Sequence, residues 1–89
     1  MNIIFDSDKD TKNIDKHGVS LELATHLEWD SALTWPDARR AYGEPRECAL
    51  VLLEARVYFV AFLDRADSRR IISLRKANPR EVNRYVFEN

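Results

Sequence analysis

Apolar residues in this chain fall into short runs that predict strands, and polar residues separate those runs. Residues 48–53 and 57–63 are apolar at almost every position, which is typical of central strands covered on both faces. Residues 70–77 form a third, β-branched run with cations at both ends. Polar turns at 54–56 and 64–69 join these runs, so the pattern predicts a three-stranded antiparallel meander.

The third of these strands carries cations whose direction can be predicted. Side chains alternate between the two faces of a strand. Arg70 and Lys76 are therefore expected on one face and Arg75 on the other. Arginine suits phosphate binding, because its planar fork matches phosphate oxygens and stays protonated. Solvated strand ends would explain the same cations, so this strand alone leaves both interpretations open.

The first third of the chain predicts one short strand and two helices. Residues 3–5 form the strand. A helix capped at residue 6 or 7 follows and ends at Gly18, because glycine favours the left-handed conformation that closes a helix. Ser20 caps the second helix. The apolar stripe of that helix, which is expected to face the core, comprises Leu23, Ala24 and Leu27.

The remaining segments complete an α+β pattern. Residues 32–35 predict a short strand or a packed loop, and residues 36–46 predict a polar loop with two prolines and a glycine. Asn78 and Pro79 end the last strand and open a helix that runs to about Phe87. The order predicts a single α+β domain over residues 1–89, with a small antiparallel sheet, two N-terminal helices and one C-terminal helix.

Composition narrows the class of protein. A chain of 89 residues fits one domain, and its single cysteine, Cys48, excludes an internal disulfide and suits a reducing cytoplasm. No apolar run approaches the roughly 20 residues that cross a bilayer, and the N-terminus lacks the pattern of a signal peptide. One cysteine and two histidines predict no metal site, and two glycines predict no phosphate loop. No cofactor is expected.

The charges are unevenly distributed, although the net charge is only −1. Residues 1–30 carry −4, residues 31–63 are balanced, and residues 64–89 carry +3. This argues against a general polyanion binder, and the acidic first third argues against direct DNA binding. The basic last third could still contact a few phosphates, or it could simply neutralise the acidic first third.

An ordered set of residues runs across nearly the whole chain: Phe5, Asp6, Lys9, Asn13, residues 16–20 and 42–44, Arg46, Arg65, residues 70–77, Glu81 and Tyr85. This set resembles a known family, the BrnT toxins, which are RelE-like ribonucleases of type II toxin–antitoxin pairs. Some positions depart from the family pattern. Members often have glycines at the turn 54–56, tryptophan at Phe5 and alanine at Leu74. None of these departures removes a cation.

The resemblance implies a RelE-like fold and metal-independent cleavage of RNA, giving a cyclic phosphate and a 5′-hydroxyl. It also implies a cognate antitoxin with a ribbon-helix-helix or helix-turn-helix domain. Toxin and antitoxin together would repress their own operon, so operator DNA would be contacted only through the antitoxin.

Metal-free RNA cleavage needs cations around the phosphorane and groups that move two protons. The candidates for charge stabilisation are Arg65, Arg70 and Arg75, with Lys76 behind them. Arg46 and Arg69 are expected to bind substrate. The open candidates for proton transfer are Glu81, Tyr85 and Glu44.

Histidine has the natural pKa for proton transfer, but a structural role at the helix end is favoured for His17, next to Gly18. His26 is expected to be solvated. Other interpretations stay open as well. Arg75 could form a structural salt bridge to Glu81 or Glu44. The rival hypothesis is a non-catalytic module of the same fold that only docks an antitoxin or another protein.

Overall fold

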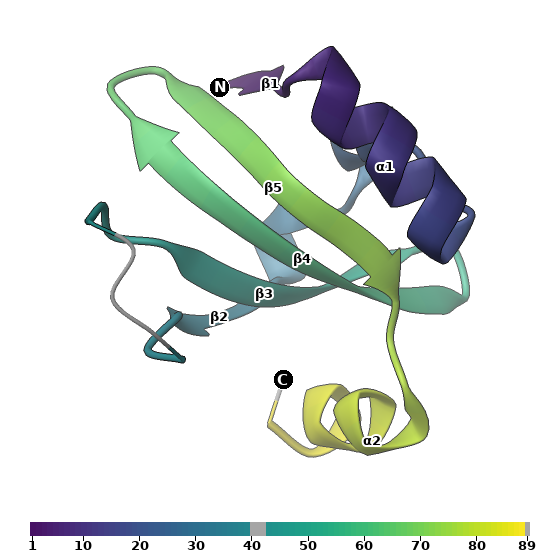
Figure 1. The fold of residues 1–89 in the computed structure, drawn as a ribbon. Helices are drawn as coiled ribbons and strands as arrows, with labels where there is room; N and C mark the ends of the chain where they lie inside the picture. Colours follow the sequence, from purple (N-terminus) through teal and green to yellow (C-terminus); the bar gives the residue numbers. More distant parts are fainter. Residues whose placement is uncertain (40–42, 89) are drawn as a thin grey trace.

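Five strands form one mixed sheet in the computed structural model, which describes residues 1–39 and 43–88 (Figure 1). The spatial order is β1-β5-β4-β3-β2. The meander β3-β4-β5 is antiparallel, as the apolar runs predict, but β1 pairs with β5 in parallel. The expectation of a purely antiparallel sheet is therefore wrong at this edge. The strands are β1 (Asn2–Ile4), β2 (Leu33–Pro36), β3 (Glu47–Leu53), β4 (Arg56–Arg65) and β5 (Ser68–Lys76).

Two α-helices flank the sheet, α1 (Ser7–His17) and α2 (Pro79–Glu88). The Asp6 side chain caps α1, and Gly18 closes it with φ +71°. The second predicted helix is a 3₁₀-helix, η1 (Leu21–His26), followed by a single turn η2 (Trp29–Ser31). In an α-helix the backbone N–H of Glu28 would bond to Ala24. Here it donates to the Leu52 carbonyl of β3, and the Trp29 indole donates to Ala24 instead.

A buried asparagine attaches α1 to the edge of β5. The Asn13 amide nitrogen donates to the carbonyls of Val19 and Leu74, both at 2.7 Å, and its oxygen accepts from the backbone N–H of Leu74 at 3.2 Å. Asn13 thus continues the hydrogen bonding of β5 beyond the short strand β1. This lets α1 lie along β5 although it has little apolar surface (Figure 1).

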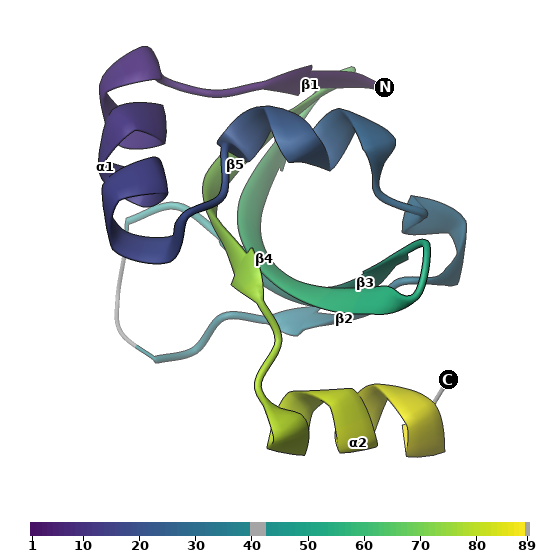
Figure 2. The same cartoon turned by 90° about the vertical axis from the view of Figure 1, so that its right-hand side faces the viewer.

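The sheet buries apolar residues on both faces. One face curves around η1, and the opposite face packs against α2 (Figure 2). We call these the inner face and the α2 face. Phe62, Ile71 and Leu74 are fully buried on the inner face, and Leu50 and Phe59 are buried on the α2 face beside Tyr85. Both sides of β3 and β4 are therefore covered, which explains their continuous apolar sequence.

A β-bulge in β5 breaks the alternation that the sequence predicts. Phe62 pairs with Ile71 and Ala61 pairs with Ser73, so Ile72 has no partner in the ladder. As a result Ile71 and Leu74 both enter the inner core. The prediction that Arg70 and Arg75 lie on opposite faces is wrong, because the extra residue brings both onto the α2 face.

Candidate functional site

A polar hollow of about 240 Å³ opens on the α2 face, beside the bulge. Arg65 comes from the end of β4 and Arg70 from the start of β5, and the loop before β3 supplies Arg46. Arg65 and Arg70 share this face because Leu63, two residues before Arg65, is the cross-strand partner of Arg70. We call this site the basic hollow. Its full lining is Lys9, Glu44, Arg46, Leu63, Arg65, Arg70 and Ile72.

Glu44 is the one carboxylate among the described residues that line the basic hollow. It forms an exposed ion pair with Arg65. The hydrogen bond and charge of Arg65 lower the pKa of the Glu44 carboxyl, and the charges of Arg70 and Arg46 lower it further. Glu44 is therefore ionised at neutral pH and can accept a proton.

Arg70 has no carboxylate partner among residues 1–39 and 43–88. It is exposed, and it faces the hollow. A phosphate that enters can therefore bind its guanidinium without displacing an acid. The structure brings three other candidates from the sequence to the same hollow as Arg70, namely Arg65, Arg46 and Glu44.

Arg75 lies on the same face but outside the basic hollow, five residues further along β5. It makes a bidentate ion pair with Glu81 of α2 at 2.8 and 2.9 Å, and its guanidinium stacks over Phe59 at 4.3 Å. Glu81 also accepts from the backbone N–H of Asn78 and so caps α2. This is the salt bridge that the sequence left open for Arg75, and it fastens α2 to the sheet.

Arg69 and Tyr85 lie away from the basic hollow and make contacts that stabilise the fold. Arg69 is on the inner face, where it pairs with Asp64 at 2.6 Å and stacks over the rings of Trp29 and Phe62. Tyr85 is buried under the α2 face, and its hydroxyl donates to the Ser31 carbonyl at 3.2 Å. The structure does not bring either side chain to the basic hollow.

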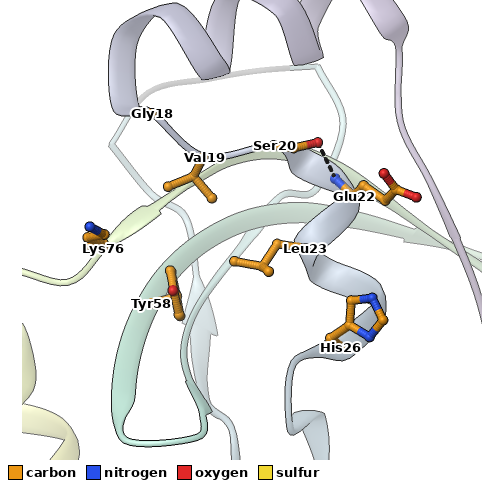
Figure 3. Close-up of a pocket in the computed structure, with 8 residues that line it drawn as sticks. All are labelled: Gly18, Val19, Ser20, Glu22, Leu23, His26, Tyr58 and Lys76. Carbon is orange, nitrogen blue, oxygen red and sulfur yellow. Dashed lines mark hydrogen bonds between the residues drawn. The ribbon is translucent and has the colours of Figure 1, made fainter.

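Lys76 lies on the inner face, in a separate hollow of about 510 Å³ (Figure 3). Val19 and Leu23 point into that hollow, and Tyr58 lies across from them on β4 (Figure 3). His26 stands at its outer side on η1 and is exposed, as expected. The structure therefore separates Lys76 from the arginines with which the sequence grouped it.

His17 ends α1 beside Gly18, and its surroundings disfavour a second proton. Burial lowers the pKa of the His17 imidazole, and the nearby charges of Lys16 and Arg75 lower it further. Gly18 adopts the left-handed conformation, and a Cβ built there would meet nothing within 4 Å. Glycine is therefore favoured at this position by the backbone angle and not by lack of space.

Sequence reasoning missed a second cationic hollow, of about 260 Å³, between α1 and β5. Lys9, Lys12 and Lys16 line it, and it shares Lys9 and Ile72 with the basic hollow. The spacing i, i+3, i+7 puts these lysines on one face of a helix and was the signal that could have found them.

Two further observations concern the described residues as a whole. They contain no cluster of three or more histidine, cysteine or acidic side chains that could hold a metal ion. None of their helices is long and apolar enough to span a membrane. Tyr42, one of the residues in the family pattern, lies outside the described part of the chain.

One family model matches the chain over residues 5–81, and its description is "Ribonuclease toxin, BrnT, of type II toxin-antitoxin system". The matched range spans most of the 89 residues and includes the whole basic hollow and the lysines of α1. It stops at Glu81, so Tyr85 lies beyond it. No curated protein matches the chain.

Proposed function

The chain belongs to the BrnT family of ribonuclease toxins of type II toxin–antitoxin systems, and we propose that the basic hollow is where it cleaves RNA. The scissile phosphodiester would rest against Arg70, with Arg65 and Arg46 lining the same hollow. Lys9 adds a fourth cation from α1. RNA cleavage, the activity of the family, is thereby assigned to one site on the sheet.

The proposed reaction uses the nucleophile that RNA carries. The 2′-oxygen attacks the neighbouring phosphorus as its proton leaves, and the bond from phosphorus to the 5′-oxygen breaks as that oxygen gains a proton. The products are a 2′,3′-cyclic phosphate and a 5′-hydroxyl. The arginines neutralise the charge that develops on the phosphorane, a role that needs fixed donors and no metal ion.

Glu44 is the proposed general base. It lies within the hollow and is ionised at neutral pH, because Arg65 lowers its pKa. A substrate phosphate would compete with Glu44 for Arg65 and so release the carboxylate toward the 2′-hydroxyl. Positioned bases of this kind typically contribute about 10²–10⁴ in rate.

The bulge at Ile72 is the observation that supports this proposal most directly. It leaves Arg70 facing the same hollow as Arg65 while the following residues return to the inner core. Bulges recur next to active sites because they redirect a side chain without ending the strand. Arg70 is the redirected residue, and its guanidinium, which has no carboxylate partner among the described residues, can bind a phosphate.

Cleavage of single-stranded RNA by the purified chain, in the presence of a metal chelator, tests the proposal. Arg70→Ala should lower kcat about 10²–10³-fold. Arg80→Ala is the matched control, since Arg80 is exposed on α2 and lies outside the hollow. Full activity of Arg70→Ala would contradict the proposed centre. Loss of cleavage on adding the chelator would contradict its metal independence.

One observation favours the alternative of a non-catalytic docking module. Arg65, Arg69 and Arg75 each pair with an acid, so much of the cationic set already has a structural partner. A folded chain that binds an antitoxin tightly but leaves RNA intact under every condition would support that alternative.

The family membership implies an antitoxin partner. We further propose that this antitoxin carries a ribbon-helix-helix or helix-turn-helix domain and that the complex represses its own operon. The toxin would act in the cytoplasm and reach operator DNA only through its partner. Purified complex that shifts the operator, while the toxin alone does not, would support this arrangement.

A further inference from the structure

Three lysines of α1 form a cationic strip that continues from the basic hollow. Lys9, Lys12 and Lys16 line the hollow between α1 and β5, together with His17. From Lys9 to Lys16 the strip extends over seven residue steps, or about 10 Å along the helix axis. We call this strip the lysine groove.

The lysine groove and the basic hollow form one path. Both are lined by Lys9 and by Ile72, the bulged residue of β5. The bulge therefore does two things at once: it turns Arg70 into the hollow and places Ile72 at the junction with the groove. Because α1 lies along β5 (Figure 1), the path follows the edge of the sheet.

Carboxylates are absent from the described lining of the lysine groove. The three lysines are exposed, and none of them makes an ion pair within the part of the chain that the structure describes. Two acids at the start of α1 have roles in the fold: Asp6 caps the helix, and Asp10 accepts hydrogen bonds from Ser20 and the backbone N–H of Leu21. Asp8 and Asp15, the other acids of the helix, line neither hollow.

We infer that the lysine groove binds the phosphates of single-stranded RNA flanking the cleaved bond, so that the substrate runs along α1. The inference rests on the proposed function, because it extends the same substrate site. Unpaired lysines that follow one track match a flexible polyanion, whose phosphates can be neutralised in turn as counterions are released. An acidic protein segment is the competing ligand, and the experiment below separates the two.

The double variant Lys12→Gln/Lys16→Gln removes two charges from the groove and leaves Lys9 in the basic hollow. Arg56→Gln/Arg80→Gln is the matched control, because it removes two exposed charges outside both hollows. Cleavage is measured on single-stranded RNA of 20 and of 4 nucleotides. Binding is measured on a fully 2′-O-methylated 20-mer, which lacks the attacking hydroxyl.

The lysine variant should raise KM for the long RNA about tenfold while kcat, and the kinetics on the short RNA, stay within about twofold. The slope of log affinity against log salt on the methylated 20-mer should shrink by about 1.4, which is about 0.7 for each lysine lost. The control variant should change neither quantity.

Unchanged binding of the methylated RNA, or an equal loss in the control variant, would overturn the inference. So would unchanged RNA binding accompanied by weaker binding of the antitoxin, which would assign the groove to a protein. A chain that cleaves no RNA but binds it through these lysines would refute the proposed nuclease and leave the groove standing. The two proposals can therefore fail separately.

Discussion

The Glu44 carboxyl is held ionised by its neighbours, and this sets how the proposed centre should respond to pH. Arg65 lowers the Glu44 pKa below its ordinary value, and Arg70 and Arg46 act in the same direction. Glu44 therefore becomes protonated only when the pH falls below about 4.5. A histidine base would behave differently: the pKa of His17 is lowered from 6.5, so it would lose activity on acidification at higher pH than Glu44.

We expect kcat/KM to stay level between pH 8 and pH 5.5, apart from any change in binding of the RNA itself. Glu44→Gln should lower kcat about 10²–10⁴-fold while KM stays the same or falls, because a negative charge leaves the phosphate site. Glu47→Gln is the control, since Glu47 does not line the hollow. Activity that falls steadily between pH 6.5 and 5.5, and stops doing so in His17→Gln, would identify His17 as the base instead.

At the scale of the elements, Asn13 attaches α1 to β5 by three hydrogen bonds between buried groups. Asn13→Ala removes both partners of the Leu74 backbone at the sheet edge. Each buried polar group left unpaired costs about 1–3 kcal/mol. We therefore expect the free energy of unfolding to fall by about 2–6 kcal/mol, measured by urea denaturation.

Two comparisons make the Asn13 test specific. Ile14→Ala changes the next, half-exposed residue of α1 and should cost less than about 1 kcal/mol. Asn13→Asp keeps the shape but turns an oxygen toward the carbonyls of Val19 and Leu74, so it should be at least as harmful as alanine. Stability of Asn13→Asp close to wild type would show that shape, and not hydrogen bonding, attaches the helix.

The hairpin between β3 and β4 turns without a glycine, and Glu54 takes a φ of +55°. A side chain in this region costs about 1–2 kcal/mol, whereas glycine enters it freely but loses more entropy on folding. Glu54→Gly should therefore be more stable than Glu54→Ala by about 0.5–1 kcal/mol. Both variants lack the carboxylate, so denaturation midpoints isolate the backbone effect. An alanine variant equal to glycine would contradict it.

Patterns within one element could be predicted, and features set by another element could not. The apolar runs located β3 and β4, and Gly18 located the end of α1. The segment after η1 is hydrogen-bonded to β3 through the N–H of Glu28, and the bulge at Ile72 is a shift in the pairing of β5 with β4. The parallel pairing of β1 depends equally on a distant strand.

The site shows the same division. Arginine type and family spacing singled out Arg46, Arg65 and Arg70, and the structure places these three in one hollow. A choice between a catalytic Arg75 and a salt-bridged Arg75 required knowing that Glu81 of α2 lies next to it. The sequence also assigned Arg69 and Lys76 to the site, but both lie on the inner face. The bulge and the strand ends decide the directions of these side chains.

Across the whole molecule, the acidic first third does not oppose a phosphate site at α1. Its net charge of −4 hides an ordered arrangement in which the lysines face the groove. Asp6 and Asp10 act within the fold, as a cap and as a link to η1. Net charge by segment is therefore a poor guide to local potential in a domain this small.

Two groups that both lie near Arg75, His17 and Glu81, should make the stability depend on pH in the same sense. Burial, with Lys16 and Arg75 nearby, lowers the His17 pKa in the folded state, so the unfolded chain binds this proton more readily. The Glu81 pKa is lowered by the hydrogen bond from Arg75, and the carboxylate is likewise favoured by folding. Both contributions are complete above the ordinary pKa of each group and are lost as the pH falls toward its folded value.

We therefore expect the free energy of unfolding to be level above about pH 7 and to decline on acidification in two stages. The first stage begins below the ordinary histidine pKa of 6.5, and the second begins below the ordinary glutamate pKa of 4.5. One group contributes a slope of at most about 1.4 kcal/mol per pH unit. Urea denaturation from pH 8 to pH 3 measures the profile. His17→Gln should flatten the first stage alone, and Glu81→Gln, which can still cap α2, should reduce the second, to which Glu44 also contributes. Stability that rises on acidification between pH 6.5 and 5 would show that His17 gains a proton on folding, against the effect of its burial and its cationic neighbours.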